Sequence, residues 1–265
     1  MDIGGILIAA AVVGGAGVII GIFLGVFGEK FKVEVDEREI KVREQLPGNN
    51  CGGCGFAGCD GLAAAIAKGE AAVDACPVGG APVGKAIGEI MGVSSEGSVH
   101  KVAFVKCAGD CEKAKEVYNY YGNEECTAME FVPNKGSKGC NYGCLGYGSC
   151  VKACPFDAIH IVDGIARVDK EKCKACGKCV AVCPRNLIEL VPYEANYLVQ
   201  CNSKEKGKDV MKNCDVGCIG CRLCEKNCPK QAVSVTDNLA HIDTDLCVQC
   251  GLCAQKCPKK IITCK

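Results

Sequence analysis

The sequence predicts an α+β protein that consists of a single N-terminal transmembrane helix, a small cysteine-rich module and two tandem cysteine-rich units. Three observations predict this class: an uncharged N-terminal run, 26 cysteines among 265 residues, and a C-terminal repeat at a fixed offset. Tryptophan is absent and aromatic residues make up only 5%, so a purely hydrophobic core would be thin. We therefore expect disulfides or metal to hold the chain together. Lys+Arg and Asp+Glu both number 31, so no basic field argues for a nucleic-acid partner.

The N-terminal run contains no charged residue from Ile3 to Gly28. A helix of this length rises roughly 39 Å, which would cross a hydrocarbon core of about 30 Å. Gly17, Gly21 and Gly25 would share one face that a second helix could approach closely. The chain lacks the basic start and the small-residue cleavage site of a secretory signal. We therefore predict a retained transmembrane anchor over residues 1–28 and a charged linker over residues 29–50.

The C-terminal part of the chain repeats at a fixed offset, which is the sequence separation of Cys140 and Cys214. Two units follow from this repeat, a first over residues 100–190 and a second over residues 195–265. Each unit has a short β-rich run after a Cys-Pro pair, which is typical of a small hairpin. Eight cysteines of the first unit recur at this offset without a gap, namely Cys140, Cys144, Cys150, Cys154, Cys173, Cys176, Cys179 and Cys183.

The cysteine spacing of the second unit is that of a bacterial-type dicluster ferredoxin domain. Two C-x2-C-x2-C-x3-C-P runs follow one another, and in this pattern the fourth cysteine of each run binds the other 4Fe-4S cluster. Zinc ribbons do not use a triple run closed in this way. The predicted ligand sets are Cys218, Cys221, Cys224 with Cys257, and Cys247, Cys250, Cys253 with Cys228.

The first unit departs from this pattern at one position. Tyr147 stands where the repeat places Cys221, so one run lacks a ligand. Cys140 precedes Cys144 with C-x3-C spacing and is the natural replacement. The predicted sets are Cys173, Cys176, Cys179 with Cys154, and Cys140, Cys144, Cys150 with Cys183; the alternative is that this unit holds one cluster fewer.

A third type of spacing, C-x2-C-x4-C-x16-C-P, occupies a module over residues 51–90. Its cysteines are Cys51, Cys54, Cys59 and Cys76, with a short alanine-rich helix expected between the last two. Glycines around the first three cysteines would let the backbone point its amides at a cluster. This order favours another 4Fe-4S cluster and brings the predicted number to five.

Six cysteines remain outside these sets, namely Cys107, Cys111, Cys126, Cys201, Cys214 and Cys264. Cys107 and Cys201 each precede their repeat, but the first copy carries an insertion that would contain Cys111 and Cys126. Two interpretations stay open. The six could be inert buried thiols, or Cys107, Cys111 and Cys126 could form an additional metal or cluster site.

The assembled pattern resembles the B subunit of the Rnf complex over essentially the whole chain. The most diagnostic stretches are residues 50–55 (Asn-Cys-Gly-Gly-Cys-Gly) and residues 143–156, which begin Gly-Cys-Leu-Gly-Tyr-Gly and end Cys-Pro-Phe. The four-cysteine module alone is also similar to the cluster domain of corrinoid iron–sulfur proteins. The chain departs from shorter family members in its second ferredoxin unit and in the insertion of the first.

The resemblance implies an iron–sulfur electron-transfer subunit of an ion-translocating ferredoxin:NAD+ oxidoreductase, with no bond-making active site of its own. It implies reduced ferredoxin as the donor, other subunits of the membrane complex as partners, and Na+ or H+ as the coupling ion. The expected location is the bacterial inner membrane, crossed once, with the soluble part on the cytoplasmic side. Two alternatives remain, a tethered subunit of a dehydrogenase or hydrogenase without ion pumping, and a non-redox protein that stores or senses iron.

Overall fold

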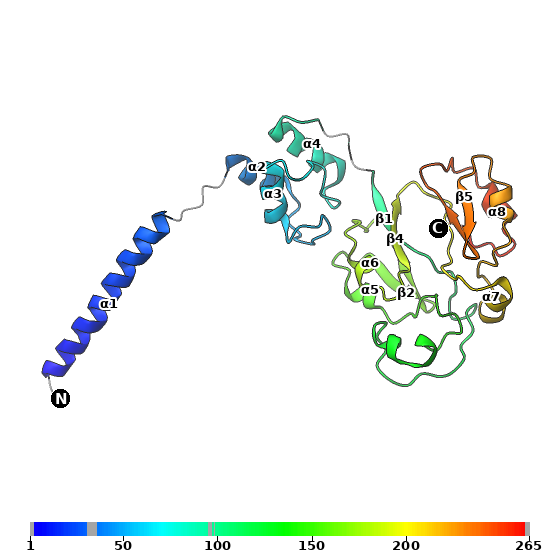
Figure 1. The fold of residues 1–265 in the computed structure, drawn as a ribbon, viewed down its shortest axis with the longest axis horizontal. Coiled ribbons are helices and arrows are strands. Elements are labelled where there is room, and N and C mark those ends of the chain that lie inside the picture. The colour runs from blue at the N-terminus through cyan, green and yellow to red at the C-terminus, as the bar shows by residue number, and fades with distance from the viewer. Residues whose placement is uncertain (1–2, 31–35, 95–96, 98, 263–265) are drawn as a thin grey trace.

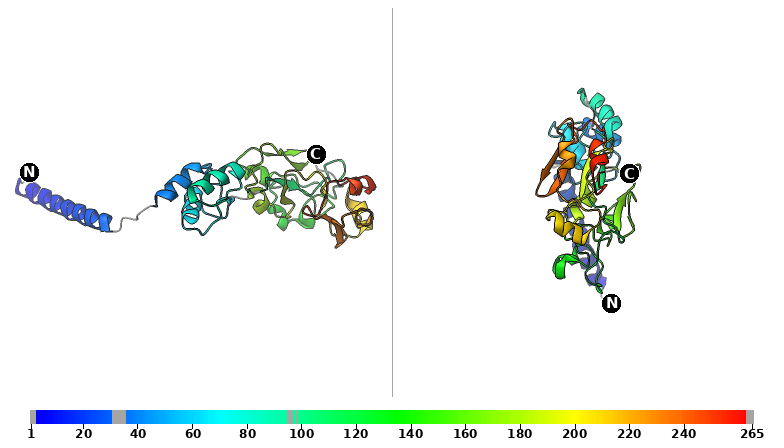
Figure 2. Two further views of the ribbon diagram at one scale, coloured as in Figure 1. Left: turned by 90° about the horizontal axis from the view of Figure 1, so that it is seen from above. Right: turned by 90° about the vertical axis from the view of Figure 1, so that its right-hand side faces the viewer.

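The computed structural model describes residues 3–30, 36–94, 97 and 99–262. These residues form an elongated molecule with helix α1 at one end and the C-terminal unit at the other (Figures 1 and 2). A small helical module and the first repeat unit lie between them. Residues 31–35 of the predicted linker, and Cys264, lie outside the described residues.

Helix α1 covers Ile3–Lys30, a length of 28 residues. Its described side chains from residue 13 to residue 28 are all exposed. A transmembrane helix needs about 20 consecutive apolar residues. No helix in the described part of the chain is both long and apolar enough to cross a membrane. The structure therefore does not support the single transmembrane span predicted for residues 1–28.

Three helices make up the N-terminal module, and their apolar faces meet in a small core. Val42, Leu62, Ile66 and Ile87 are buried there together with Cys59 and Cys76. The module begins earlier than the sequence suggested, because the helix that contains Val42 lies within the predicted linker. The helices are α2 (Glu37–Gln45), α3 (Cys59–Ala67) and α4 (Gly80–Met91).

The first repeat unit contains two antiparallel strand pairs and two short helices. Strand β1 (Lys101–Val105) pairs with β4 (Ile188–Pro192), and β2 (Ile159–Val162) pairs with β3 (Ile165–Val168). Apolar residues of these strands and several cysteines form one core. The short helices are α5 (Ser149–Lys152) and α6 (Lys178–Val182), and the segment between β1 and α5 contains the 3-10 turns η1 (Ala128–Phe131) and η2 (Pro133–Lys135).

The second repeat unit has the same hairpin and the same helix pair at the offset of the cysteine repeat. The register Ile159↔Val168 of the first hairpin recurs as Val233↔Ile242. The β1–β4 pair is reduced in the second unit to the bridge Val199↔Ile262. The repeat predicted from the cysteines therefore extends to the backbone. The elements of this unit are α7 (Gly207–Asn213), α8 (Leu223–Lys226), β5 (Val233–Thr236), β6 (Leu239–Ile242) and α9 (Leu252–Lys256).

Candidate metal centres

The second unit contains two cavities, and each is lined by four cysteines. The runs that begin at Cys218 and Cys247 each supply three of them, and the fourth comes from the other run, as the spacing predicts. One cavity of about 370 Å³ is lined by Cys218, Cys221, Cys224 and Cys257. The other, of about 340 Å³, is lined by Cys228, Cys247, Cys250 and Cys253.

The first unit also contains two such cavities, and one of them differs from the prediction. The cavity of about 310 Å³ is lined by Cys154, Cys173, Cys176 and Cys179, which are the predicted set. The cavity of about 400 Å³ is lined by Cys126, Cys144, Cys150 and Cys183. The structure thus places Cys126, not Cys140, beside Cys144 and Cys150. The reason is that the insertion folds back on α5, where the Cys126 N–H donates to Ser149 Oγ at 3.2 Å.

Three of the four cysteines of the N-terminal module lie close together near the start of α3. Asn50 Oδ1 accepts a hydrogen bond from the Cys59 N–H at 2.8 Å, which fixes the first turn of that helix. The Gly79 N–H donates to Cys76 Sγ at 3.4 Å. Burial raises the pKa of Cys76, and the nearby thiols of Cys54 and Cys59 raise it further. These contacts bring Cys54, Cys59 and Cys76 together.

The N-terminal module contacts the first unit through a glycine. A Cβ atom added to Gly53 would lie 2.7 Å from the backbone oxygen of Cys176, which is too close for any side chain. Gly53 lies between two predicted ligands of the module, and Cys176 is a predicted ligand of the first unit. The thiol groups of the two regions are therefore neighbours.

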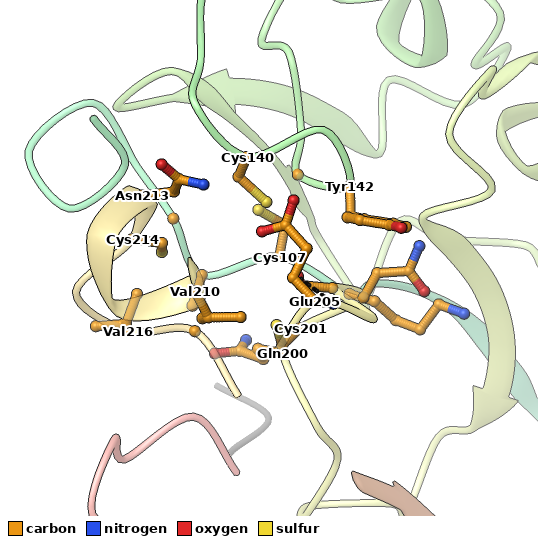
Figure 3. A pocket seen from close by; sticks show the side chains of 17 residues that line it. Cys107, Cys140, Tyr142, Gln200, Cys201, Glu205, Val210, Asn213, Cys214 and Val216 are labelled. Atoms are coloured by element: carbon orange, nitrogen blue, oxygen red, sulfur yellow. Dashed lines mark hydrogen bonds between the residues drawn. The ribbon is translucent and has the colours of Figure 1, made fainter. Parts of the chain in front are cut away.

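A further cavity lies between the two repeat units (Figure 3). It is lined by four cysteines from both units, and Figure 3 shows their side chains around one space. These four are Cys107, Cys140, Cys201 and Cys214. Cys111 is exposed and lines none of the five cavities, so the structure does not bring it together with Cys107 and Cys126.

Burial makes three of the thiols around these cavities especially weak acids. It raises the pKa of Cys150, Cys179 and Cys201 to about 12, because a thiolate is poorly solvated there and lies near other thiolates. The described cysteines are all free thiols, so no disulfide joins any two of them. Metal binding at these sites must therefore displace protons from the thiols.

The arrangement fits clusters better than single metal ions. No three Cys, His, Asp or Glu side chains among the described residues converge closely enough to hold one ion. In a 4Fe-4S cubane each thiolate binds a different iron, so its ligands stand farther apart than those of one ion. Four thiols around a cavity of about 310 to 400 Å³ are the donor set that such a cluster requires.

Sequence reasoning missed two placements, those of Cys126 and Cys140. The signal for Cys140 was present, because its repeat counterpart Cys214 has no place in either ferredoxin run of the second unit. A residue whose counterpart is not a ferredoxin ligand is a poor candidate for one. Nothing in the spacing pointed to Cys126, since its position depends on how the insertion folds.

Comparison with known families identifies the modules. The Fe-S cluster family matches residues 46–78. Families of 4Fe-4S dicluster domains match residues 133–184 and, in two overlapping matches, residues 172–232 and 217–261. The predicted tandem dicluster ferredoxin domains are thereby confirmed, and the chain contains several domains that bind 4Fe-4S clusters.

Comparison with curated proteins identifies the family. The chain is 47% identical to the B subunit of the Na(+)-translocating ferredoxin:NAD(+) oxidoreductase complex of Acetobacterium woodii, over 91% of this chain and 72% of that protein. It is 44% identical to the B subunit of the ion-translocating oxidoreductase complex of Methanosarcina acetivorans, over 89% of each chain. It is 40% identical to the B subunit of the proton-translocating ferredoxin:NAD(+) oxidoreductase complex of Clostridium ljungdahlii, over 87% of this chain and 81% of that protein. On this similarity the chain belongs to the family of B subunits of ion-translocating oxidoreductase complexes, the Rnf complexes that its sequence resembles.

Proposed function

We propose that this chain is the iron–sulfur electron-transfer subunit of a membrane-bound Rnf-type complex. It accepts electrons from reduced ferredoxin and passes them to partner subunits, and the complex couples this flow to NAD+ reduction and to translocation of Na+ or H+. The relatives in Acetobacterium and Clostridium carry this activity in their names. The observation that carries the proposal is the series of four-thiol groups along the chain, the first two of which meet where Gly53 packs against Cys176.

Five groups of thiols would hold the clusters of the dicluster units and the N-terminal module. When bound, a 4Fe-4S cluster supplies one centre that takes up and releases single electrons. We assign Cys126, in place of Cys140, to the second group of the first unit. The five ligand sets are Cys51, Cys54, Cys59 and Cys76; Cys154, Cys173, Cys176 and Cys179; Cys126, Cys144, Cys150 and Cys183; Cys218, Cys221, Cys224 and Cys257; and Cys228, Cys247, Cys250 and Cys253.

Backbone N–H groups around the thiols would adjust the redox potential. The Ala103 N–H donates to Cys173 Sγ at 3.3 Å, and the Ala166 N–H donates to Cys144 Sγ at 3.4 Å. Such donors stabilise negative charge on sulfur, so they favour the reduced state of whatever the thiolates bind. The strands β1 and β3 that carry these donors therefore act as fixed polar supports for the ligands.

The second unit presents the surface on which a soluble donor would dock. Cys221 and Cys250 are exposed, whereas their neighbours in the same runs are buried or half-buried. Lys226, Lys230 and Lys256 are exposed in the same runs or directly after them. Positive side chains close to accessible ligands would steer a ferredoxin with an acidic surface toward them.

The opposite end of the molecule would attach to the membrane part of the complex. Along α1 the exposed apolar side chains include Val13, Ile19 and Leu24, with exposed fractions of 72%, 70% and 64%. Apolar side chains exposed over such a length need a partner, which lipid or the membrane subunits would provide. The thiol ligands need a reducing compartment, so the soluble part would lie on the cytoplasmic side.

Reduction by ferredoxin under strict anaerobiosis tests this function. Reduced ferredoxin is mixed with the loaded chain, and the rate of bleaching of the iron–sulfur absorbance is measured at low and high salt. We expect the triple variant Lys226→Glu, Lys230→Glu, Lys256→Glu to slow the second-order rate by at least about tenfold at low salt. Its salt dependence should also flatten, because the steering charges are gone.

Lys152→Glu is the matched control, because Lys152 is the repeat counterpart of Lys226 and is exposed in the first unit. This variant should react at the rate of the unmodified chain. An equal loss of rate in the control would place the docking surface elsewhere. Failure of the unmodified chain to bleach with any reduced ferredoxin would refute the electron-transfer function itself.

A further inference from the structure

The cavity between the two repeat units has the same construction as the ferredoxin cavities. Its volume of about 370 Å³ lies within the range of about 310 to 400 Å³ found for the four cavities inside the units. Like them it is lined by four cysteines. Unlike them it takes two cysteines from each unit, Cys107 and Cys140 from the first and Cys201 and Cys214 from the second.

The two pairs of cysteines occupy equivalent places in the repeat. Cys107 follows the β1 residue Val105, which faces Ile188. Cys201 follows Val199, which faces Ile262, the repeat counterpart of Ile188. The residue before each cysteine makes the same backbone hydrogen bond in both units. The Lys106 N–H donates to the Leu187 carbonyl, and the Gln200 N–H donates to the Ile261 carbonyl, both at 2.8 Å.

Cys140 and Cys214 complete the pattern, because they too are repeat counterparts of each other. The two units therefore contribute matched pairs of thiols to one cavity, as they would if the repeat were related by an approximate twofold axis through it. Two pairs of cysteines that recur at structurally equivalent places in the two units are a built feature of the fold and not an accidental meeting of side chains.

Two pairs of the sulfur atoms, Cys107 with Cys140 and Cys107 with Cys214, are close enough to bind one cluster. A Cβ atom added to Gly143 would lie 3.5 Å from Cys140 Sγ and 3.6 Å from Cys107 Sγ. These two sulfur atoms are therefore at most about 7 Å apart. The position of a Cβ added to Gly109 lies 3.2 Å from Cys214 Sγ and 3.8 Å from Cys107 Sγ. Glycine at both positions leaves the space between the sulfurs open.

A single ion does not suit this spacing. Two thiolates bound to one zinc ion at about 2.3 Å stand no more than about 4.6 Å apart. Within the described ranges no three ligand side chains are that close together. Four thiols spread around one cavity need an inorganic core that offers a separate metal to each of them, as a cubane does.

The charges around the cavity suit an anionic group. Lys138 is buried, and its Nζ donates to the Gly164 carbonyl at 2.9 Å. Arg185 donates to the carbonyls of Cys140 and Gly143, both at 2.9 Å. Glu205 also lines the cavity, and its charge opposes that of a cluster. The two cations do not line the cavity, but they stand near Cys107 and Cys140 on its first-unit side and outweigh this one carboxylate.

We propose that Cys107, Cys140, Cys201 and Cys214 hold a sixth 4Fe-4S cluster at the junction of the two units. The thiols on its two sides touch the nearest ferredoxin group of each unit. The Cys144 N–H donates to Cys107 Sγ at 3.3 Å, and the Cys218 N–H donates to Cys201 Sγ at 3.3 Å. The junction site thus joins the thiol groups of the first unit to those of the second.

This inference rests on the proposed loading of the ferredoxin units with clusters, and it adds a station that the ferredoxin pattern does not contain. With it, 24 of the 25 described cysteines belong to six groups of four, and Cys111 is left over. Without it, the series of groups would be interrupted where the chain passes from one unit to the other.

The test is a count of iron and sulfide per full-length chain, together with a spin-quantified EPR redox titration, both under strict anaerobiosis. Six cubanes give about 24 irons and five give about 20. We expect about 24 in the unmodified chain. We expect each of the variants Cys140→Ser and Cys214→Ser to lose about four irons and one reducible signal. Cys111→Ser, the control, should keep all of them.

The variants also distinguish this site from the ferredoxin sites. Cys140→Ser should leave the signals of the first unit unchanged, whereas loss of a first-unit signal would return Cys140 to the set with Cys144. A count of about 20 irons in the unmodified chain would overturn the junction site and leave the five other clusters intact. The unmodified count decides the matter even if a variant fails to fold, and one zinc or one iron in place of four would overturn it as well.

Discussion

The two repeat units have the same backbone fold, yet they differ in how much of that fold is held by protein contacts alone. The first unit has a five-residue strand pair between β1 and β4, and the second has a single bridge in its place. The first unit also draws one thiol from an insertion, through Cys126, where the second has Cys221 within its run. The first unit is thus stabilised by an additional strand pair and an insertion, whereas the second unit lacks both and exposes two of its predicted ligands.

The largest expected difference between the units appears when iron is removed. Anaerobic chelation should unfold the second unit first, because both cores contain cysteines but the core of the second unit has fewer other residues to hold it together. Hydrogen exchange measures this unit by unit. We expect amides of the β5–β6 hairpin to lose at least about tenfold more protection than those of the β1–β4 pair. Equal loss in both pairs would mean that the additional strand pair contributes nothing on its own.

The next comparison exchanges the ligand that differs between the units. Cys126→Ser should remove one cluster, about four irons per chain, because Cys144, Cys150 and Cys183 then lack a fourth thiol. Adding Tyr147→Cys restores the residue type that the repeat has at Cys221. Iron analysis and EPR of the double variant should show the lost cluster again. If Cys126→Ser alone keeps its full iron content, the assignment of Cys126 is wrong.

A smaller effect distinguishes the two hairpins. Ile165 in β3 is fully buried, and its counterpart Leu239 in β6 is half-buried. Ile165→Ala should lower the free energy of unfolding of the loaded chain by about 3 kcal/mol, and Leu239→Ala by about 1 to 2 kcal/mol. Anaerobic guanidinium titration of both variants gives these values. The reverse ranking would show that the second hairpin is packed more tightly than its burial indicates.

The smallest effect concerns the turn before the short helices α5 and α8. Gly148 has φ +76° in the first unit, and Arg222 has φ +58° at the equivalent place in the second. Arg222→Gly relieves about 1 kcal/mol of strain in the left-handed backbone conformation at this position. Two effects oppose this gain: the exposed ion pair with Glu225 is lost, and glycine gives the unfolded chain more conformational entropy. The free energy of unfolding should change by less than about 0.5 kcal/mol. Gly148→Arg, in contrast, should cost about 1 to 2 kcal/mol.

Local spacing predicted those parts of the molecule that depend on neighbouring residues. The ferredoxin runs brought Cys218, Cys221 and Cys224 around one cavity with the crossing Cys257, because a loop of three closely spaced cysteines has few ways to fold around a cluster. The constant offset between the two copies predicted the second hairpin. The first feature follows from contacts between residues close in sequence, and the second follows from the similarity of the two copies.

Non-local contacts account for what the sequence did not predict. Cys126 reaches its cavity because residues of the insertion pack on Ser149, and no spacing rule describes that path. Cys140 faces Cys107, Cys201 and Cys214, and that site exists only once the two units meet. The predicted linker contains α2 because Val42 finds a core in the module that follows it. In each case the partner lies far along the chain.

The sharing of one cavity by two units has a consequence for how such a chain can change. Because each unit supplies two of the four thiols, deleting either unit would leave two cysteines of the other exposed at the surface. An unrelated ferredoxin domain in its place would not supply the two missing cysteines. Loss, exchange or shuffling of one copy would therefore damage the other. A family member without the second unit would lack this shared cavity altogether, so the site belongs only to chains that carry both copies.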